Sequence, residues 1–195
     1  MNRPRAIAKR VLALDPASRG VGFAVLEGPT RLIDWGVKET RGKPPRTVLS
    51  QLDALLTRCQ PEVLVIEDCT ARGSRRCPRV RQLLRAAAAR ATRRHVRPRR
   101  VSRRALLTFF APSGARTKHE IAQAIAARFP ELHPRVPPPR KPWMSEDARL
   151  SIFDAIAFAL ADFQRRDRRQ RTAGTPRRAP PPPAGRAASR AWPGS

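Results

Sequence analysis

The chain has 195 residues, enough for one domain with tails, and 41% of them are hydrophobic, so an ordinary core can form. Its 41 basic residues against 15 acidic ones give a formal net charge of +26. A folded protein with so much self-repulsion typically has a polyanionic partner, and we therefore expect DNA or RNA. A GC-rich genome would explain why only five of the basic residues are Lys, but it does not explain the scarcity of Asp and Glu.

The composition also argues against other classes of protein. No apolar run approaches the ~18 residues of a membrane span, and no basic amphipathic helix carries a bulky aromatic face. The first ten residues are basic but lack the apolar stretch of a signal peptide. The three cysteines, Cys59, Cys69 and Cys77, are odd in number and show no CxxC spacing. They predict a reducing, cytoplasmic setting and favour neither a disulfide framework nor a zinc site.

The first forty residues have the pattern of three short strands. A basic extension over residues 1–9 precedes an apolar run at 11–14, which predicts a buried strand ending in Asp15. Residues 21–27 alternate between larger and smaller side chains, and residues 32–37 form a third run. The connections between these runs are short, so we expect an antiparallel meander.

The spacing of the apolar residues then changes to that of helices, which alternate with further strands. Apolar residues recur at helical spacing over 48–56 and again over 80–91. Between these helices, the continuous apolar run at 63–66 predicts a central strand that ends in Glu67. A right-handed crossover would make this strand a parallel neighbour of the first. Residues 96–101 contain a proline, which restricts them to an edge strand.

The second half of the sequence predicts helices. Ser102 is placed to cap a short helix through Phe110, and Thr117-x-x-Glu120 is a capping box that opens another helix. We expect an extended connector over 133–142 and a long helix from Ser145 to about Gln164. The domain would span 10–166, and the Arg-, Pro- and Ala-rich residues 167–195 would form a disordered tail.

Three acidic residues stand out in a chain that has few. Asp15 and Glu67 each close a buried strand at its carboxyl end, which is the edge where α/β sheets bind ligands. Neighbouring strands lie about 4.8 Å apart, so both carboxylates could reach one metal ion. Asp154 lies in an apolar helical segment, where an ionised carboxylate is costly unless paired or bound to metal. The alternatives are solvated strand-end acids and, for Asp154, a surface position or an Arg partner.

These acids lie in segments that resemble RuvC-type Holliday junction resolvases. Residues 12–25 resemble the first hairpin of that family, residues 65–67 its second acidic strand, and residues 154–157 its last acidic helix. The resemblance implies a ribonuclease H-like α/β fold with a mixed five-stranded sheet flanked by helices. It also implies Asp15, Glu67 and Asp154 as catalytic residues and metal ligands for two Mg²⁺ or Mn²⁺ ions, and a homodimer active on DNA in recombination and repair.

Several positions depart from the resolvase pattern. The family usually carries another ligand three residues before the last Asp, where this chain has Ser151. The segment after Glu67 has no aromatic residue that could wedge into a junction, and Ala17 replaces a glycine that is common in the first turn. The block at 141–147 looks like a feature of a divergent RuvC-like branch, and we expect its Trp143 to pack over the start of the last helix.

Asp147 and Ser151 are both candidates for a fourth ligand. Asp147 would share a helix face with Asp154, but about 10 Å of helical rise would separate their backbones. Two Asp side chains rarely bring oxygens to within ~2.1 Å of one ion across that gap. Asp147 is also explained as a first-turn acid behind a Ser145 cap. Ser151 is one turn from Asp154 and could hold a metal-bound water.

The main functional hypothesis is a metal-dependent endonuclease that hydrolyses phosphodiester bonds of DNA, including branched DNA. The alternatives are an RNA-processing ribonuclease of the YqgF type and a catalytically inactive nucleic-acid-binding protein with the same fold. A sugar-kinase-like ATPase needs two such domains, for which the chain is too short. Basic residues near the predicted acidic edge are the expected nucleic-acid contacts: Arg19, Arg72, Arg75, Arg76, Arg81, Arg85 and Lys118.

Overall fold

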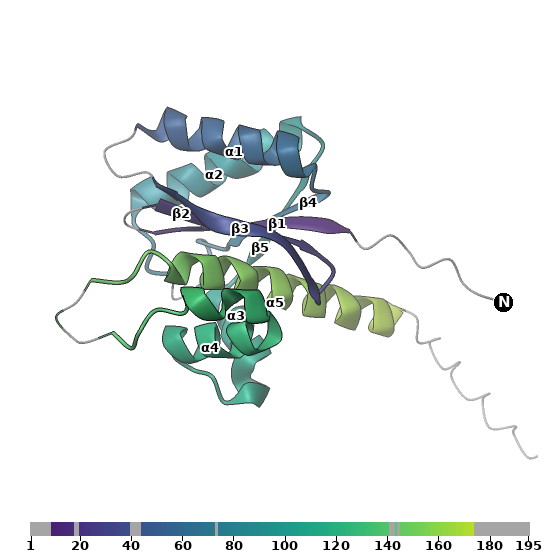
Figure 1. Cartoon of the computed structure of the whole chain (residues 1–195). Coiled ribbons are helices and arrows are strands. Elements are labelled where there is room, and N and C mark those ends of the chain that lie inside the picture. The colour runs from purple at the N-terminus through teal and green to yellow at the C-terminus, as the bar shows by residue number, and fades with distance from the viewer. Residues whose placement is uncertain are drawn as a thin grey trace, which may run out of the picture.

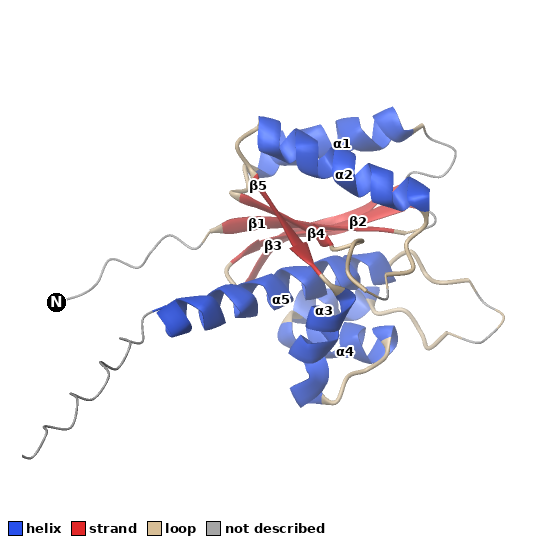
Figure 2. Ribbon diagram, turned by 180° about the vertical axis from the view of Figure 1, so that it is seen from behind, coloured by secondary structure: helices blue, strands red, loops and turns tan. Residues whose placement is uncertain are grey.

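A computed structural model describes residues 9–17, 20–39, 44–72, 74–140, 143 and 145–173. One sheet is covered by helices on both faces (Figures 1 and 2). Its elements follow in the order β1 (Arg10–Pro16), β2 (Gly20–Glu27), β3 (Arg31–Glu39), α1 (Pro45–Cys59), β4 (Val63–Glu67), α2 (Pro78–Arg93), β5 (Arg97–Val101), α3 (Arg103–Phe110), η1 (Ala111–Ser113), α4 (Lys118–Arg128), η2 (Pro130–Arg135) and α5 (Leu150–Ala173).

The sheet has five strands in the order β3-β2-β1-β4-β5. The pairs β1–β2 and β2–β3 are antiparallel, while β1–β4 and β4–β5 are parallel. The predicted meander, the crossover to a parallel neighbour and the edge position of β5 are therefore confirmed. Leu14 of β1 pairs with Ile66 of β4, so the two strands end side by side with Asp15 and Glu67 next in line.

Each face of the sheet has its own apolar core. On one face α1 and α2 pack over the sheet, and on the other α5 lies across it with α3 and α4 beneath (Figure 1). In β1, Val11 and Ala13 join the α5 core, whereas Leu12 and Leu14 join the α1–α2 core. Because strands alternate their side chains between faces, burial on both sides accounts for the continuous apolar runs of β1 and β4.

Local capping signals are also confirmed. The Ser102 side chain accepts a hydrogen bond from the Ala105 N–H at the start of α3. Thr117 and Glu120 form the reciprocal capping box of α4. Helices α1 and α2 both begin with a proline at the first helical position. A backbone N–H at this position has no partner within the helix, so proline loses no hydrogen bond there.

The last helix differs from its predicted limits at both ends. Helix α5 starts at Leu150 because the Asp147 carboxylate accepts the Arg149 N–H while the Asp147 carbonyl accepts the Leu150 N–H, so residues 145–149 form the turn before the helix. It continues to Ala173, past the expected domain limit at 166, with an ion pair between Arg171 and Asp167 on consecutive turns. Residues 174–195 of the predicted tail lie outside the described residues.

Two further expectations before α5 are corrected. Residues 133–135 belong to the 3₁₀ helix η2, so the extended connector begins only after it. Helix α4 ends at Arg128, and Pro130 stands at the first position of η2, where its ring pre-sets the backbone. Trp143 is 78% exposed, so it does not pack over the start of α5 as expected.

Helix α5 touches the sheet at Gly22. A Cβ built on Gly22 would lie 2.3 Å from the backbone carbonyl carbon and oxygen of Ser151 and 2.5 Å from its Oγ. Gly22 is the register partner of Asp15, and paired residues project to the same face of a sheet. The absence of a side chain at Gly22 therefore brings the first turn of α5 against the face that carries Asp15.

We predict that Gly22→Ala lowers the free energy of unfolding by about 3 kcal/mol, because the new methyl group overlaps backbone atoms that cannot rotate away. Gly36→Ala in β3 is the matched control. There a Cβ meets only ring carbons of Phe23, at 3.1 and 3.4 Å, and the ring can shift. Urea unfolding measures both variants, and equal losses would show that α5 is free to move off the sheet.

Candidate functional site

The structure brings the three predicted carboxylates together at one end of the sheet. Asp15 ends β1, Glu67 ends β4, and Asp154 lies in the second turn of α5. Asp15 and Glu67 follow the alternation of the strand residues that face α5, so all three project into the seam between sheet and helix. They are 2%, 6% and 2% exposed.

The carboxylates interact electrostatically. Burial, together with the negative charges of Asp154 and Glu67, raises the pKa of Asp15 to about 7, against the lowering effects of Arg76 and Lys118. The contributions of Asp154 and Glu67 to this shift show that the three carboxylates lie close enough to interact. The three side chains therefore form one site.

Arg76 bridges the two strand-end acids. Its Nε donates to Glu67 Oε2 at 2.5 Å, its Nη1 donates to the Pro16 carbonyl oxygen at 2.7 Å, and its Nη2 pairs with Asp15 Oδ1. The planar guanidinium presents its donors as a fork, which matches two carboxylates on neighbouring strands. Arg76, predicted as a nucleic-acid contact, pairs with both carboxylates in this structure.

Asp154 has its own cationic partners. Arg103, at the start of α3, donates from Nη1 to Asp154 Oδ1 at 2.8 Å. Lys118, at the start of α4, places its Nζ 2.9 Å from Asp154 Oδ2 and also pairs with Glu146. Sequence analysis placed Lys118 among nucleic-acid contacts, left the role of Glu146 open as part of the block at 141–147, and did not single out Arg103. The only local signal for Arg103 is its position directly after the Ser102 cap.

The two candidates for a fourth ligand lie in different surroundings. Ser151 is 1% exposed, and its Oγ donates to the Ala148 carbonyl oxygen at 2.5 Å beside Gly22. Asp147 precedes α5, so the predicted separation along a shared helix is wrong. Its carboxylate accepts hydrogen bonds from the Arg149 N–H at 2.8 Å and from the Arg149 guanidinium at 2.7 Å.

The other predicted basic residues are on the surface. Arg72, Arg75, Arg81 and Arg85 are all exposed, in the segment after β4 and on α2. Arg81 donates from Nε to the Arg76 carbonyl oxygen at 2.9 Å. This bond links α2 to the backbone of the residue whose side chain bridges the two acids. Arg19 lies outside the described residues.

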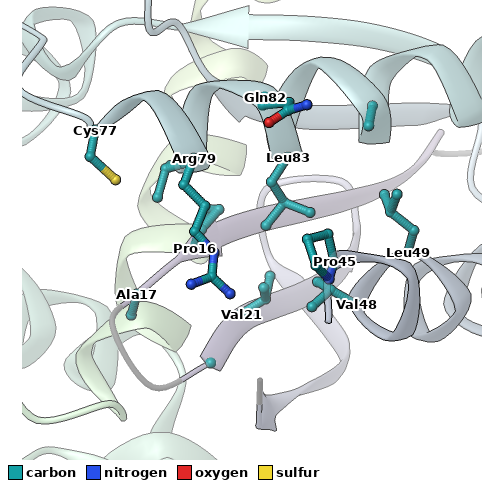
Figure 3. A pocket seen from close by; sticks show the side chains of 13 residues that line it. Pro16, Ala17, Val21, Pro45, Val48, Leu49, Cys77, Arg79, Gln82 and Leu83 are labelled. Carbon is teal, nitrogen blue, oxygen red and sulfur yellow. The ribbon is translucent and has the colours of Figure 1, made fainter. Parts of the chain in front are cut away.

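An apolar hollow of about 520 Å³ adjoins this edge on the opposite face of the sheet. Figure 3 shows Val21, Leu49 and Leu83 around it, with the Arg79 side chain extending toward Pro16 and Val21. No acidic residue lines it within the described part of the chain. The hollow therefore differs in character from the α5 face, where the three carboxylates lie.

The donor set suits a hard divalent cation. Carboxylate oxygens are the ligands that Mg²⁺ and Mn²⁺ prefer. The pKa of Asp15 is raised, mainly by burial and then by the charge of Asp154, although Arg76 and Lys118 act to lower it. Among the described residues, no group of three or more acidic, His or Cys side chains is arranged to hold a metal ion. Arg76, Arg103 and Lys118 hold the carboxylates instead, so an ion would compete with them for the same oxygens.

Comparison with known proteins connects this architecture to resolvases. No family model and no curated protein sequence matches the chain. RuvC from Thermus thermophilus superposes with a TM-score of 0.57 at 21% identity, over 81% of this chain and 96% of that one. The same protein in complex with a Holliday junction substrate gives 0.59 at 20% identity, over 82% and 96%. The yeast mitochondrial Holliday junction resolvase Ydc2 gives 0.57 at 13%, over 87% and 85%.

These likenesses establish the fold. The chain has the RuvC-type, ribonuclease H-like fold that its three acidic motifs predicted. Within the described residues, no helix is long and apolar enough to cross a membrane.

We predict that Asp15 makes the protein less stable as pH rises. Its folded pKa of about 7 exceeds the ordinary 3.8, so the folded state binds the proton more tightly. That stabilisation is complete below pH 4 and is lost as the pH rises through 7, with a loss on the order of 2–4 kcal/mol.

Urea unfolding in metal-free buffer from pH 4 to 8 measures this dependence. The difference between wild type and Asp15→Asn isolates the contribution of Asp15 from those of other acids. Parallel pH profiles for the two proteins would contradict the prediction.

Proposed function

We propose that this chain is a metal-dependent endonuclease that hydrolyses phosphodiester bonds of DNA, including branched DNA. The observation that carries the proposal is the convergence of three buried carboxylates, from β1, β4 and α5, on one seam of a RuvC-type fold. Burial of so many acids is costly, and a hydrolytic site is a reason to retain them.

Each residue of the site has a role in this proposal. Asp15, Glu67 and Asp154 would hold one or two Mg²⁺ or Mn²⁺ ions, which when bound supply water activation and charge stabilisation. Arg103 and Lys118 orient the Asp154 carboxylate through contacts of 2.8 and 2.9 Å. Arg76 holds Asp15 and Glu67 at the ends of adjacent strands.

The surroundings of the site favour nucleic acid as the substrate. The net charge of +26 and the exposed arginines around the carboxylate edge provide the field that attracts and positions a phosphate backbone. One of the similar structures is a resolvase in complex with a Holliday junction. DNA is therefore the proposed polymer, and RNA is tested beside it.

A second candidate is a nucleic-acid-binding protein without catalysis. Two observations favour it: Ser151 stands where the resolvases usually carry an acid, and three cations of the chain already contact the three carboxylates. Such a protein would bind the same substrates and leave them intact with or without divalent ions.

Cleavage assays decide between these functions. End-labelled four-way junction, duplex and single-stranded DNA, with the matching RNAs, are incubated with the full chain in Mg²⁺, Mn²⁺ or EDTA. We expect ion-dependent cleavage of DNA, with the junction among the substrates. Cleavage of RNA alone would support a ribonuclease, and binding without cleavage in either ion would support the inactive protein.

We predict that Asp15→Asn, Glu67→Gln and Asp154→Asn each abolish cleavage while binding persists. Removal of a direct ligand should cost more than the about 10–100-fold that follows loss of an outer hydrogen-bond partner. Asp53→Asn is the control, because Asp53 pairs with Arg90 and Arg94 on the opposite layer of the molecule. A variant that retained full activity would remove its residue from the site.

We also predict that Asp147→Asn lowers the cleavage rate less than Asp154→Asn. The Asp147 carboxylate is engaged with Arg149 in the turn before α5, whereas Asp154 is held inside the seam by Arg103 and Lys118. Single-turnover cleavage rates in saturating Mn²⁺ compare the two variants. Equal loss in a folded Asp147→Asn protein would place Asp147 among the ligands.

A further inference from the structure

A small basic cavity lies directly beside the carboxylate site. Its volume is about 220 Å³, and it opens between the carboxyl end of β4, the segment that follows, α2 and β5. Glu67 forms part of its wall, so the cavity adjoins the acidic seam. Sequence analysis predicted two of its arginines as nucleic-acid contacts but did not predict a cavity.

Three arginines line this cavity. Arg81 and Arg85 lie one turn apart on α2, and Arg100 comes from β5, which pairs with β4. None of the three forms an ion pair with a carboxylate anywhere in the described part of the chain. The pKa of Asp68 is lowered, first by the hydrogen bond from Thr70 and also by the nearby positive charge of Arg100. The wall is therefore rich in positive charge that no direct ion pair compensates within the described residues.

A buried hydroxyl completes the lining. Ser74 Oγ is inaccessible to solvent and has no hydrogen-bond partner among the described residues. A buried polar atom without a partner is costly, so such atoms call for a ligand or a water. Thr70, also in the wall, donates its hydroxyl hydrogen to Asp68 Oδ1 at 2.6 Å. Ser74 is thus the hydroxyl without a partner, and rotation of its side chain toward the cavity would let it donate to an anion.

We propose that this cavity binds a backbone phosphate next to the scissile one. The proposal rests on the proposed function, since it makes the cavity a subsite of the same active site. Guanidinium groups bind phosphate oxygens through paired, charge-assisted hydrogen bonds, and the Ser74 hydroxyl adds a neutral donor. Cys69 and Leu84 supply apolar wall suited to a sugar, and the absence of an aromatic ring from the lining argues against base stacking.

The position of the cavity suits it to orient the substrate relative to the carboxylates. Arg81 is tied to the Arg76 carbonyl oxygen, and Arg76 in turn bridges Asp15 and Glu67. A phosphate held at Arg81, Arg85 and Arg100 therefore sets the register of the strand relative to Glu67. This contact positions the substrate and takes no part in bond cleavage.

Binding measurements without metal test the subsite. A fluorescently labelled single-stranded oligonucleotide is titrated with the full chain in EDTA at a series of salt concentrations. The variants are Arg85→Ala, Arg100→Ala and Ser74→Ala. The matched control is Arg93→Ala, an exposed arginine at the end of the same helix and outside the cavity. Cooperative unfolding of each variant is checked first.

The expected pattern separates a phosphate subsite from general attraction. Arg85→Ala and Arg100→Ala should each weaken binding about 3–10-fold at low salt and reduce the slope of log K against log salt by about 0.7. Ser74→Ala should weaken binding without changing the slope, because it removes no charge. Arg93→Ala should change affinity less than twofold. Pocket variants that behave like Arg93→Ala would overturn the subsite.

A second arm identifies the source of the phosphate. Inorganic phosphate competes with the oligonucleotide at constant ionic strength, with chloride as the reference. Weak competition, together with the slope changes above, supports a backbone phosphate. Tight binding of inorganic phosphate, with no loss of oligonucleotide affinity in the variants, would make this a free-anion site and overturn the proposal. An inactive protein could still show the slope changes, and an active nuclease could lack them, so this test is independent of cleavage.

Discussion

Three carboxylates buried between the sheet and α5 constrain the rest of the molecule. An ion taken out of water costs several kcal/mol unless a partner compensates it. Here the compensating charges come from three separate places: Arg76 before α2, Arg103 at the start of α3 and Lys118 at the start of α4. Each of these segments is therefore tied to the same seam, and the site and the helical layers depend on one another.

The close contact between α5 and the sheet follows from small side chains. Gly22 leaves room for Ser151, and α5 continues across β1 and β2 with alanines that are fully buried. A larger residue at Gly22 would separate the helix from the strands and carry Asp154 away from Asp15. The glycine therefore affects the geometry of the carboxylates although it has no side chain of its own.

Charge is arranged with opposite signs inside and outside this edge. The acids are buried in the seam, while Arg72, Arg75, Arg81 and Arg85 face solvent around it. An approaching phosphate backbone meets the arginines first and the carboxylates only at close range. For the proposed function, this arrangement would reconcile attraction for a polyanion with an acidic site that would otherwise repel it.

Much of the fold follows from local patterns in the sequence. Alternation and continuous apolar runs predicted the five strands, short connections predicted the meander, and Ser102 and Thr117 marked helix starts that the structure confirms. The meeting of Asp15 and Glu67 was also predictable, because the carboxyl ends of parallel neighbours share one edge of a sheet.

Other features depend on contacts between distant parts of the chain. The bridge from Arg76 to Asp15 spans 61 residues, and that from Arg103 to Asp154 spans 51. Among so many arginines, no spacing rule marks those that turn inward. The start of α5 likewise depends on how the Asp147 side chain meets the Arg149 N–H, and the cavity at Ser74 exists only where α2, β4 and β5 converge. A local pattern records which face of an element is apolar, whereas ion pairing is decided by which charges folding brings within a few ångströms in a region that water cannot reach.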